Sequence, residues 1–300
     1  MSVVLAGLTT GLPHPLLTPD ANPGYRRLRD AFAEARDVIR ASGAERLVLY
    51  STYWPSVIGH QAITDPNPRW THVDELFHDL GSISYDRPVD AALAEAVVDA
   101  AKRRGLSARG VNYHGFPMDT GSVTALELLD PDCEWPAVVL SSNVYADRAE
   151  TLVWAKATRD AIAASSRPTA VFAISSLSNR LFTTFIRPED DAIHSPKDDE
   201  WNRKILQFLS EGRLEDTAQL SRTIQQQIRV KKVVNFKALW WLSAVAGPHN
   251  RYHGTVHAYA PVQGTGAAVV TLRPREEGLG DKEFDEDDVE VWRGDREVLS

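Results

Sequence analysis

The histidines are the residues of this chain whose side chains and positions could support chemistry. The chain has nine histidines but a single cysteine, Cys133, which excludes an internal disulfide and a thiolate metal cluster. A metal site would therefore have to use His, Asp or Glu side chains. His14 stands between two prolines that fix the local backbone, and we expect them to keep its imidazole out of any helix.

Two histidines and one asparagine follow apolar runs that are typical of buried strands. His14 comes after VVLA, His60 in the loop after RLVLYST, and Asn179 in the loop after TAVFAIS. Layered α/β sheets bind ligands at the carboxyl ends of their strands. A lone histidine of this kind is more often a turn residue, but the shared position of His14 and His60 favours a common site. Two histidines and one carboxylate on one face are typical ligands of non-haem Fe(II).

Seven β-branched runs alternate with segments of helical spacing, which predicts an α/β fold. The predicted helices are Tyr25 to Ala41, Val89 to Arg104, Arg148 to Ala164 and Asp198 to Ser210. No internal repeat or low-complexity linker precedes Pro274, so we expect one domain over residues 1–273. The tail, residues 274–300, is dense in acid and has few apolar residues to bury, which predicts a mobile segment.

The composition argues against two classes of partner. The net charge is −8, with acidic residues spread along the chain, whereas a nucleic-acid binder normally has a clustered basic face. The first residues lack a basic segment and a long apolar run, and nowhere do about 18 consecutive apolar residues occur. We expect a cytoplasmic chain that binds neither nucleic acid nor membrane.

Eight segments resemble, in their order, the landmarks of class III extradiol ring-cleavage dioxygenases. They are GLPHPLL, YSTYWPSVIGHQ, HVDELFHDLGSISYD, ARGVNYHGFPMDTGS, LSNRLF, DDEWNRKIL, NFKALWWLSAVAG and YAPVQGTGAAVV. The resemblance runs to about Leu272 and is closest to the subunits of 2-aminophenol 1,6-dioxygenases, which pair a catalytic chain with a related non-catalytic one. It implies one α/β domain with a central mixed sheet flanked by helices, and Fe(II)-dependent opening of an aromatic ring by O₂.

The resemblance implies a metal site that this chain retains only in part. It places metal ligands at His14 and His60, and both histidines are present. It implies a glutamate ligand at the position of Asn235 and an acid/base histidine at the position of Asn179. Without the carboxylate we expect Fe(II) to bind this chain weakly or not at all, as a vestigial site.

The sequence differs from the family pattern at a third position, in the predicted substrate pocket. Active members tend to have the sequence DHG where this chain has Asp119, Thr120 and Gly121. Thr120 and Asn179 are therefore the residues that we expect to line a pocket for an aromatic small molecule. An asparagine amide cannot shuttle protons as histidine does, but it can hydrogen-bond a ligand.

Three functional hypotheses follow. The leading one is an accessory, non-catalytic subunit that pairs with a catalytic paralogous subunit, in a complex that holds Fe(II) and opens an aminophenol- or catechol-type ring. The alternative is a metal-dependent enzyme in its own right that uses His14, His60 and an unidentified third ligand on a different aromatic substrate. A third is a free-standing binding module for an aromatic ligand.

Other conspicuous residues are expected to be structural. Trp240 and Trp241 should pack in a core helix, and Gly264 to Gly266 should form a turn. Solvent-facing helix positions are the expectation for His72 and His78. We expect His249, His253 and His257 to lie on the surface or in a strand. We expect the carboxylates to act as helix caps, to lie in turns or to be solvated, namely Asp20, Asp74, Glu75 and Asp119.

Overall fold

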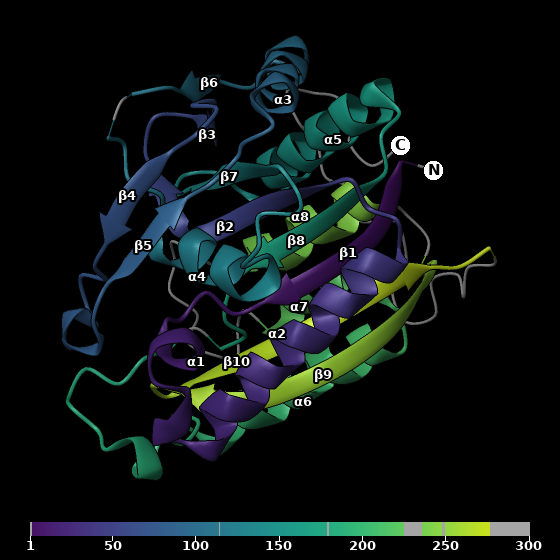
Figure 1. Ribbon diagram of the computed structural model, residues 1–300. Helices are drawn as coiled ribbons and strands as arrows, with labels where there is room; N and C mark the ends of the chain where they lie inside the picture. Colours follow the sequence, from purple (N-terminus) through teal and green to yellow (C-terminus); the bar gives the residue numbers. More distant parts are fainter. Residues whose placement is uncertain (1, 114, 179, 225–235, 248–249, 277–300) are drawn as a thin grey trace.

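Eight strands form one mixed sheet in the computed structural model of the chain (Figure 1), which describes residues 2–113, 115–178, 180–224, 236–247 and 250–276. Its strands, in spatial order, are β6 (Ala108–Val111), β3 (His60–Ile63), β7 (Ala137–Asn143), β2 (Arg46–Ser56), β8 (Thr169–Ile174), β1 (Val3–Thr9), β10 (Thr265–Pro274) and β9 (Tyr252–Val262). A separate hairpin joins β4 (Arg69–His72) to β5 (Ile83–Asp86).

Parallel pairing dominates the middle of the sheet and antiparallel pairing its sides. Strands β7, β2, β8 and β1 run parallel, whereas β10 and β9 are antiparallel to β1 and to each other. On the other side β3 is antiparallel to β7 and parallel to β6. The turn from β9 to β10 uses Gln263 and Gly264, whose φ angles of 52° and 89° are typical of a two-residue hairpin. The predicted turn is confirmed, one residue earlier than expected.

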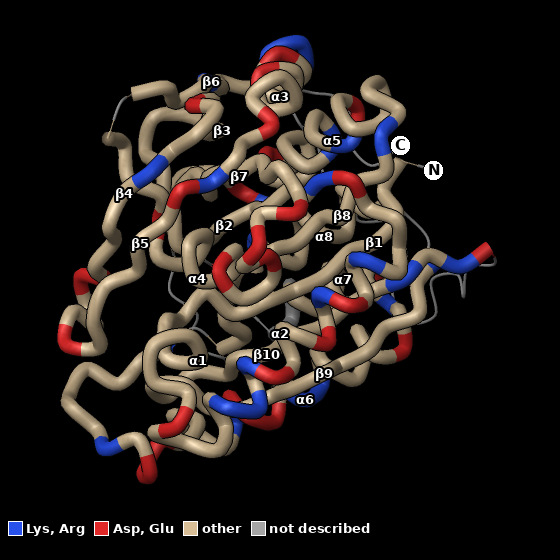
Figure 2. The backbone as a smooth tube through the Cα atoms, in the orientation of Figure 1, with Lys and Arg blue, Asp and Glu red and all other residues tan. Residues whose placement is uncertain are grey.

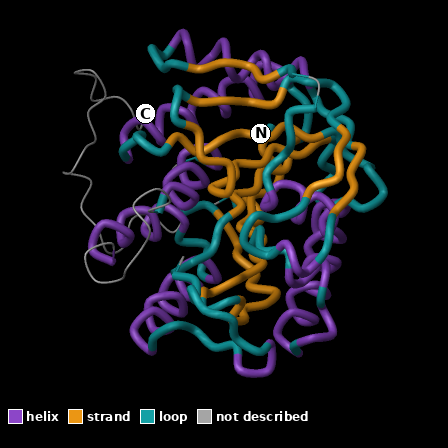
Figure 3. Tube along the Cα trace, turned by 90° about the vertical axis from the view of Figure 1, so that its left-hand side faces the viewer, coloured by secondary structure: helices purple, strands orange, loops and turns teal. Residues whose placement is uncertain are grey.

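Helices cover both faces of the sheet, as Figure 3 shows. The helices are α1 (His14–Leu17), α2 (Pro23–Ala41), α3 (Ala91–Arg103), α4 (Thr120–Leu129), α5 (Arg148–Ser165), α6 (Pro196–Ser210), α7 (Leu214–Ile224) and α8 (Lys237–Ala246). Three short 3₁₀ helices are η1 (Pro19–Ala21), η2 (His78–Leu80) and η3 (Pro188–Asp190).

Alternate residues of each central strand enter two separate cores. In β2, Val48 and Tyr50 pack with α3 and α5 to α8, whereas Leu47 and Leu49 pack with α2 and α4. A strand buried on both faces needs apolar residues at nearly every position, which explains why the β-branched runs were strong predictors. The prediction of a single α/β domain with a central mixed sheet flanked by helices is confirmed.

Most of the structural expectations are confirmed. Trp240 and Trp241 are buried in α8, where Trp241 stacks on Tyr50 with ring centroids 5.1 Å apart. His253 and His257 lie on β9, while His249 lies outside the described residues. The prediction for His72 was wrong: it ends strand β4 and is half-buried, because a short exposed strand lacks the alternation that identifies strands.

The end of the sheet lies close to the predicted domain boundary. Strand β10 ends at Pro274, and the predicted mobile tail lies outside the described residues from residue 277 onward. Among the helices that the structure describes, none has the length and apolar character needed to cross a membrane.

Candidate functional site

His14 begins helix α1 and lies beside the largest cavity near the predicted site. The expectation that its prolines keep it out of a helix was wrong, because Pro13 is the N-cap and Pro15 lies in the first turn. Backbone N–H groups of a first turn have no partner within the helix, so proline is tolerated there. The imidazole is buried and packs edge-on against the rings of Tyr25 (5.2 Å) and Phe77 (4.7 Å).

The cavity beside His14 has a volume of about 710 Å³ and mostly apolar walls. Its aromatic walls come from Tyr25, Phe77, Phe182 and Phe185. This volume lies within the range of small-molecule sites, about 300 to 1,000 Å³. The cavity is therefore large enough for an aromatic ring.

Burial keeps His14 neutral. Loss of hydration lowers the pKa of His14 to about 4, and the carboxylates of Asp191, Asp74 and Asp79 oppose this shift only in part. At pH 7 the imidazole is uncharged and has one donor and one acceptor nitrogen. Its Nδ1 is buried and has no hydrogen-bond partner among the described residues.

Asp191 ties the rim of this cavity together. Its carboxylate accepts a hydrogen bond from the Tyr25 hydroxyl at 2.7 Å, and from the backbone N–H groups of Gln263 (2.6 Å) and Gly264 (3.0 Å). These contacts join the segment before α6 to helix α2 and to the turn between β9 and β10. No local pattern around Asp191 predicted this role, since its partners are distant in the chain.

His60 begins strand β3, so its predicted loop position was wrong. Strand β2 continues through Pro55 to Ser56, and the connection to His60 is only three residues long. Pro55 has no N–H to donate, which argued against a strand, but a register shift in the pairing with β7 accommodates it. The backbone N–H of His60 donates to the carbonyl of Ser107 at 2.8 Å and fixes its position against β6.

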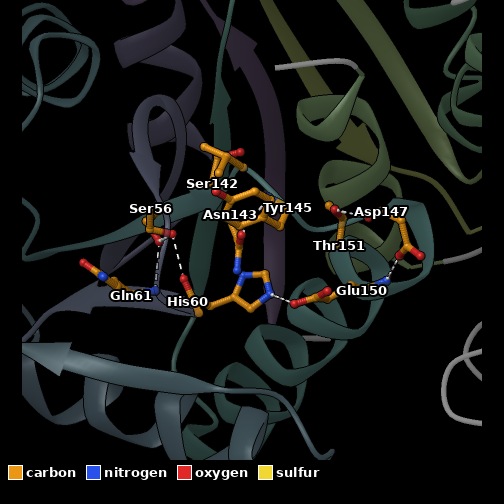
Figure 4. A network of polar contacts seen from close by, with 12 residues as sticks. Ser56, His60, Gln61, Ser142, Asn143, Tyr145, Asp147, Glu150 and Thr151 are labelled. Atoms are coloured by element: carbon orange, nitrogen blue, oxygen red, sulfur yellow. Dashed lines mark hydrogen bonds and ion pairs between the residues drawn. The ribbon is translucent and has the colours of Figure 1, made fainter. Parts of the chain in front are cut away.

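The imidazole of His60 is bound within this chain by two residues of helix α5. Its Nε2 lies 3.1 Å from Oε1 of Glu150, and its ring stacks on Trp154 with centroids 5.0 Å apart. Figure 4 shows the ring pointing toward Glu150. Glu150 and Trp154 are four residues apart, so they lie on the same face of the helix. When Nε2–H donates to the Glu150 carboxylate, the lone pair of the neutral ring lies on Nδ1, which is buried and has no hydrogen-bond partner among the described residues.

The sequence predicted neither Glu150 nor Trp154 as a partner of His60. Asp147 caps α5 by accepting a hydrogen bond from the Glu150 N–H at 2.8 Å, an Asp-x-x-Glu pattern that is recognisable in the sequence. That pattern predicts the start of a helix and not a contact with a residue 90 positions earlier. The alternation of strands and helices alone does not show which helix side chain meets which strand.

Lys237 brings a further charge close to Glu150. Its buried ammonium donates to the carbonyl oxygens of Asn143 and Val144, which lie between β7 and α5. Burial lowers the pKa of Lys237 to about 8, and the carboxylates of Glu150 and Asp147 oppose the shift. Lys237 begins helix α8, the core helix that contains Trp240 and Trp241.

Thr120 takes part in a separate chain of hydrogen bonds. Its hydroxyl donates to Asp74 at 2.6 Å and contacts Nε2 of His72. Asp74 also accepts from the N–H groups of Leu76 and Phe77, and Asp119 caps helix α4. The expectation that these two carboxylates act as caps or turn residues is confirmed. That Thr120 lines a substrate pocket stays a prediction.

Burial raises the pKa of the Asp119 carboxyl, and hydrogen bonds from Ser122 and Ser51 oppose the shift. Asp20 lies on the surface, where it pairs with Arg26 at 2.7 Å. Both arrangements are structural.

Two of the predicted site residues cannot be placed. Asn179 and Asn235 lie outside the described residues, so their predicted roles stay predictions. His14 lies in helix α1, beyond the end of strand β1, whereas His60 begins strand β3. Four strand spacings separate β1 from β3, roughly 19 Å at about 4.8 Å per spacing. Within the described part of the chain, no three His, Cys, Asp or Glu side chains are arranged to hold one metal ion.

Comparison with known proteins establishes the family. Residues 10–271 match the family model described as the catalytic LigB subunit of aromatic ring-opening dioxygenase. The chain belongs to the LigB family. It is 32% identical over 271 residues, 90% of this chain and 98% of the relative, to a 2-aminophenol 1,6-dioxygenase alpha subunit from a Pseudomonas species. It is 28% identical to the beta subunit of a Pseudomonas 2-aminophenol 1,6-dioxygenase, over 91% of this chain and 92% of that subunit.

A solved structure shares the LigB fold of this chain. The crystal structure of an uncharacterized protein from Escherichia coli K12 superposes with a TM-score of 0.62 and covers 89% of this chain and 99% of its own. The identity is 14%, so the likeness concerns the fold alone.

The described residues do not fit the iron centre that is typical of LigB dioxygenases. Such a centre needs two histidines and a carboxylate with free lone pairs directed at one point. Here His60 lies beside Glu150 and His14 packs between the rings of Tyr25 and Phe77, and the described residues hold no group of three His, Cys, Asp or Glu side chains placed for one metal ion. No step of ring cleavage is therefore derived through iron in this chain.

Proposed function

We propose that this chain is the accessory, non-catalytic subunit of a cytoplasmic two-subunit extradiol dioxygenase that opens an aminophenol- or catechol-type ring with O₂. The catalytic paralogous subunit binds the Fe(II). The observation that carries the proposal is that Asn179 and Asn235 stand where the resemblance places the acid/base histidine and the glutamate ligand. An amide neither carries the negative charge of a carboxylate ligand nor shuttles protons as a histidine does.

The relatives support the two-subunit part of the proposal. One is named as an alpha subunit and the other as a beta subunit of 2-aminophenol 1,6-dioxygenase, and this chain matches both over about nine-tenths of its length. The higher identity is to the alpha subunit. A paralogous pair of chains with one fold is thus the assembly that the similarity favours.

The surface charge and the cavity support the proposed classes of partner. In the view of Figure 2, Lys and Arg residues are interspersed with Asp and Glu instead of gathering into one basic face, which disfavours nucleic acid. The aromatic cavity beside His14 suits a planar small molecule. Binding of an aromatic ligand there needs no metal ion, so this subunit can keep a ligand site without catalysing ring cleavage.

Co-expression tests the proposal. The chain is purified alone and together with the related chain of the same genome that has both histidines, the glutamate and the LSH motif. Oxygen uptake is then measured with 2-aminophenol and with catechol. We expect uptake from the complex and none from this chain alone. Ring cleavage by the isolated chain at the rate of the complex would refute the accessory role.

A second candidate function is favoured by Glu150. Its carboxylate lies next to His60 and could replace the glutamate that the family alignment misses at Asn235. The chain would then be a metal-dependent enzyme with altered ligands. Zinc or iron binding that disappears in both Glu150→Gln and His60→Ala, but not in Asp160→Asn on the same helix, would favour this candidate over the accessory role.

A further inference from the structure

The cavity beside His14 has a buried end and an open mouth. His14 and Tyr25 line the buried end and are only 5% and 2% exposed. Leu76 and Phe185 also line the cavity but are 67% and 83% exposed, so they mark its mouth. A ligand that enters from solvent therefore passes these apolar side chains before it reaches His14.

Hydrogen bonds and ring contacts hold the walls of this cavity in place. The N–H of Phe182 donates to the carbonyl of Gln263 at 2.9 Å, and its ring stacks on His194 with centroids 5.1 Å apart. The N–H of Phe77 donates to the carboxylate of Asp74 at 2.8 Å. Walls that are fixed before a ligand binds lose little conformational entropy on binding.

The charged groups at the cavity are negative. In the described part of the chain, Asp79 is the one lining residue with a carboxylate, and no Lys or Arg side chain lines the cavity. Behind the wall, the Asp191 carboxylate receives its hydrogen bonds from uncharged donors, the Tyr25 hydroxyl and two backbone N–H groups. An anion in such an apolar cavity loses its hydration and is repelled by both carboxylates.

The other polar groups of the lining suit hydroxyl or amino substituents. His14 contributes an imidazole whose Nδ1 is buried without a partner among the described residues. Thr183, Thr184 and Gln263 add hydroxyl and amide groups to the lining. Hydroxyl and amino groups on a ring exchange hydrogen bonds with side chains of these types. None of these groups supplies the positive charge that a carboxylate would need.

We propose that this cavity is a metal-independent binding site for uncharged aromatic molecules with hydroxyl or amino substituents, and that it discriminates against aromatic carboxylates; this inference rests on the proposed function. The aromatic walls contact a planar ring regardless of its charge, so the carboxylates of Asp79 and Asp191 decide between ligands. The accessory subunit then holds a ring of the class that the catalytic subunit opens.

Calorimetric titration of the chelator-treated chain at pH 7 tests the site with three ligands built on one ring. Catechol is uncharged, a dihydroxybenzoate adds a carboxylate to that ring, and the matching dihydroxybenzamide adds an uncharged amide of similar size. We expect catechol and the benzamide to bind with similar affinity. The benzoate should bind at least about tenfold more weakly, as for repulsion between like charges at an effective dielectric constant of about 20.

Substitutions at the mouth assign the effect to this cavity. Asp79→Asn should reduce the discrimination against the benzoate by about two- to fivefold, because Asp79 is exposed and screened by solvent. Asp160→Asn, which removes an exposed carboxylate from helix α5, is the matched control and should discriminate as the wild type does. Ala21→Trp and Thr184→Trp each fill the cavity from an exposed lining position and should weaken catechol binding at least about tenfold. Thermal unfolding shows that each variant is folded.

The outcomes separate the two proposals. Equal affinity for the benzoate and the benzamide, or no binding of catechol, overturns the site and leaves the accessory role intact. Catechol binding that survives both filling variants places the ligand elsewhere and overturns the inference. Binding that is lost on chelation and restored by Fe(II) also overturns it. Ring cleavage by the isolated chain at the rate of the complex overturns the accessory role, whereas titration of the metal-free chain still shows whether the cavity discriminates.

Discussion

The surroundings of His14 and of His60 differ although both histidines stand at positions of family metal ligands. His14 borders a cavity of about 710 Å³ and has a buried Nδ1 without a partner among the described residues. His60 also has a buried Nδ1 without a partner among the described residues, but Glu150 lies at the Nε2 edge of its ring and Trp154 stacks on one face. The difference indicates that the His14 region retains room for a ligand, while the His60 region has become part of the scaffold.

The two regions should differ most in the free energy of unfolding that is lost when a packed aromatic ring is removed. Trp154→Ala deletes a fully buried ring beside His60 and should lower the free energy of unfolding by about 3 to 5 kcal/mol. Phe77→Ala removes a half-buried ring from the wall of the His14 cavity and should cost about 1 to 2 kcal/mol, because that space is already partly open. Urea unfolding measures both. Equal losses would contradict the contrast between a packed region and an open one.

The next effect is a dependence of stability on pH that comes from His14. Its folded pKa of about 4 is below its unfolded value of 6.5, so the unfolded chain binds the proton more tightly. The stabilisation is complete above pH 6.5 and is lost as the pH falls toward 4, by about 3 kcal/mol in total. The neighbouring carboxylates of Asp191, Asp74 and Asp79 limit this loss.

The pH effect can be assigned by substitution. His14→Gln should flatten the part of the stability curve between pH 6.5 and pH 4, measured by urea unfolding of chelator-treated protein. A variant whose curve has the same slope as the wild type in this range would show that another group is responsible.

The smallest effect should come from the ion pair of His60. Glu150→Gln keeps a hydrogen-bond acceptor but removes the charge, and we expect a loss of about 1 kcal/mol in stability. Asp160→Asn, which breaks an exposed pair with Arg104 on the same helix, should cost about 0.5 kcal/mol or less. If the control costs as much as Glu150→Gln, the His60 pair has no special role in the scaffold.

The sequence predicted the sheet far better than the site. All seven β-branched runs contain strands, and the central ones are the clearest because strands buried on both faces need continuous apolar residues. The short strands β3, β4 and β5 were missed, because four residues are too few to give a clear periodicity.

The site depends on contacts that local patterns do not contain. The pairing of His60 with Glu150 and that of Tyr25 with Asp191 join residues 90 and 166 positions apart. The sequence pattern predicted that both histidines lie near strand ends. Only the tertiary structure shows which helix contacts each imidazole ring. Family resemblance supplied the expected ligand set, and the described contacts show that Glu150 and Trp154 lie beside His60.

Anaerobic titration of the isolated chain with Fe(II), followed by calorimetry and by iron content, tests the central claim most directly. The wild type should bind no stoichiometric iron, and the His14→Ala, His60→Ala double variant should give the same result. Gain of binding in Asn235→Glu would support the alignment of that residue with the glutamate ligand of the family. One equivalent of iron bound by the wild type and lost in the double variant would contradict the account.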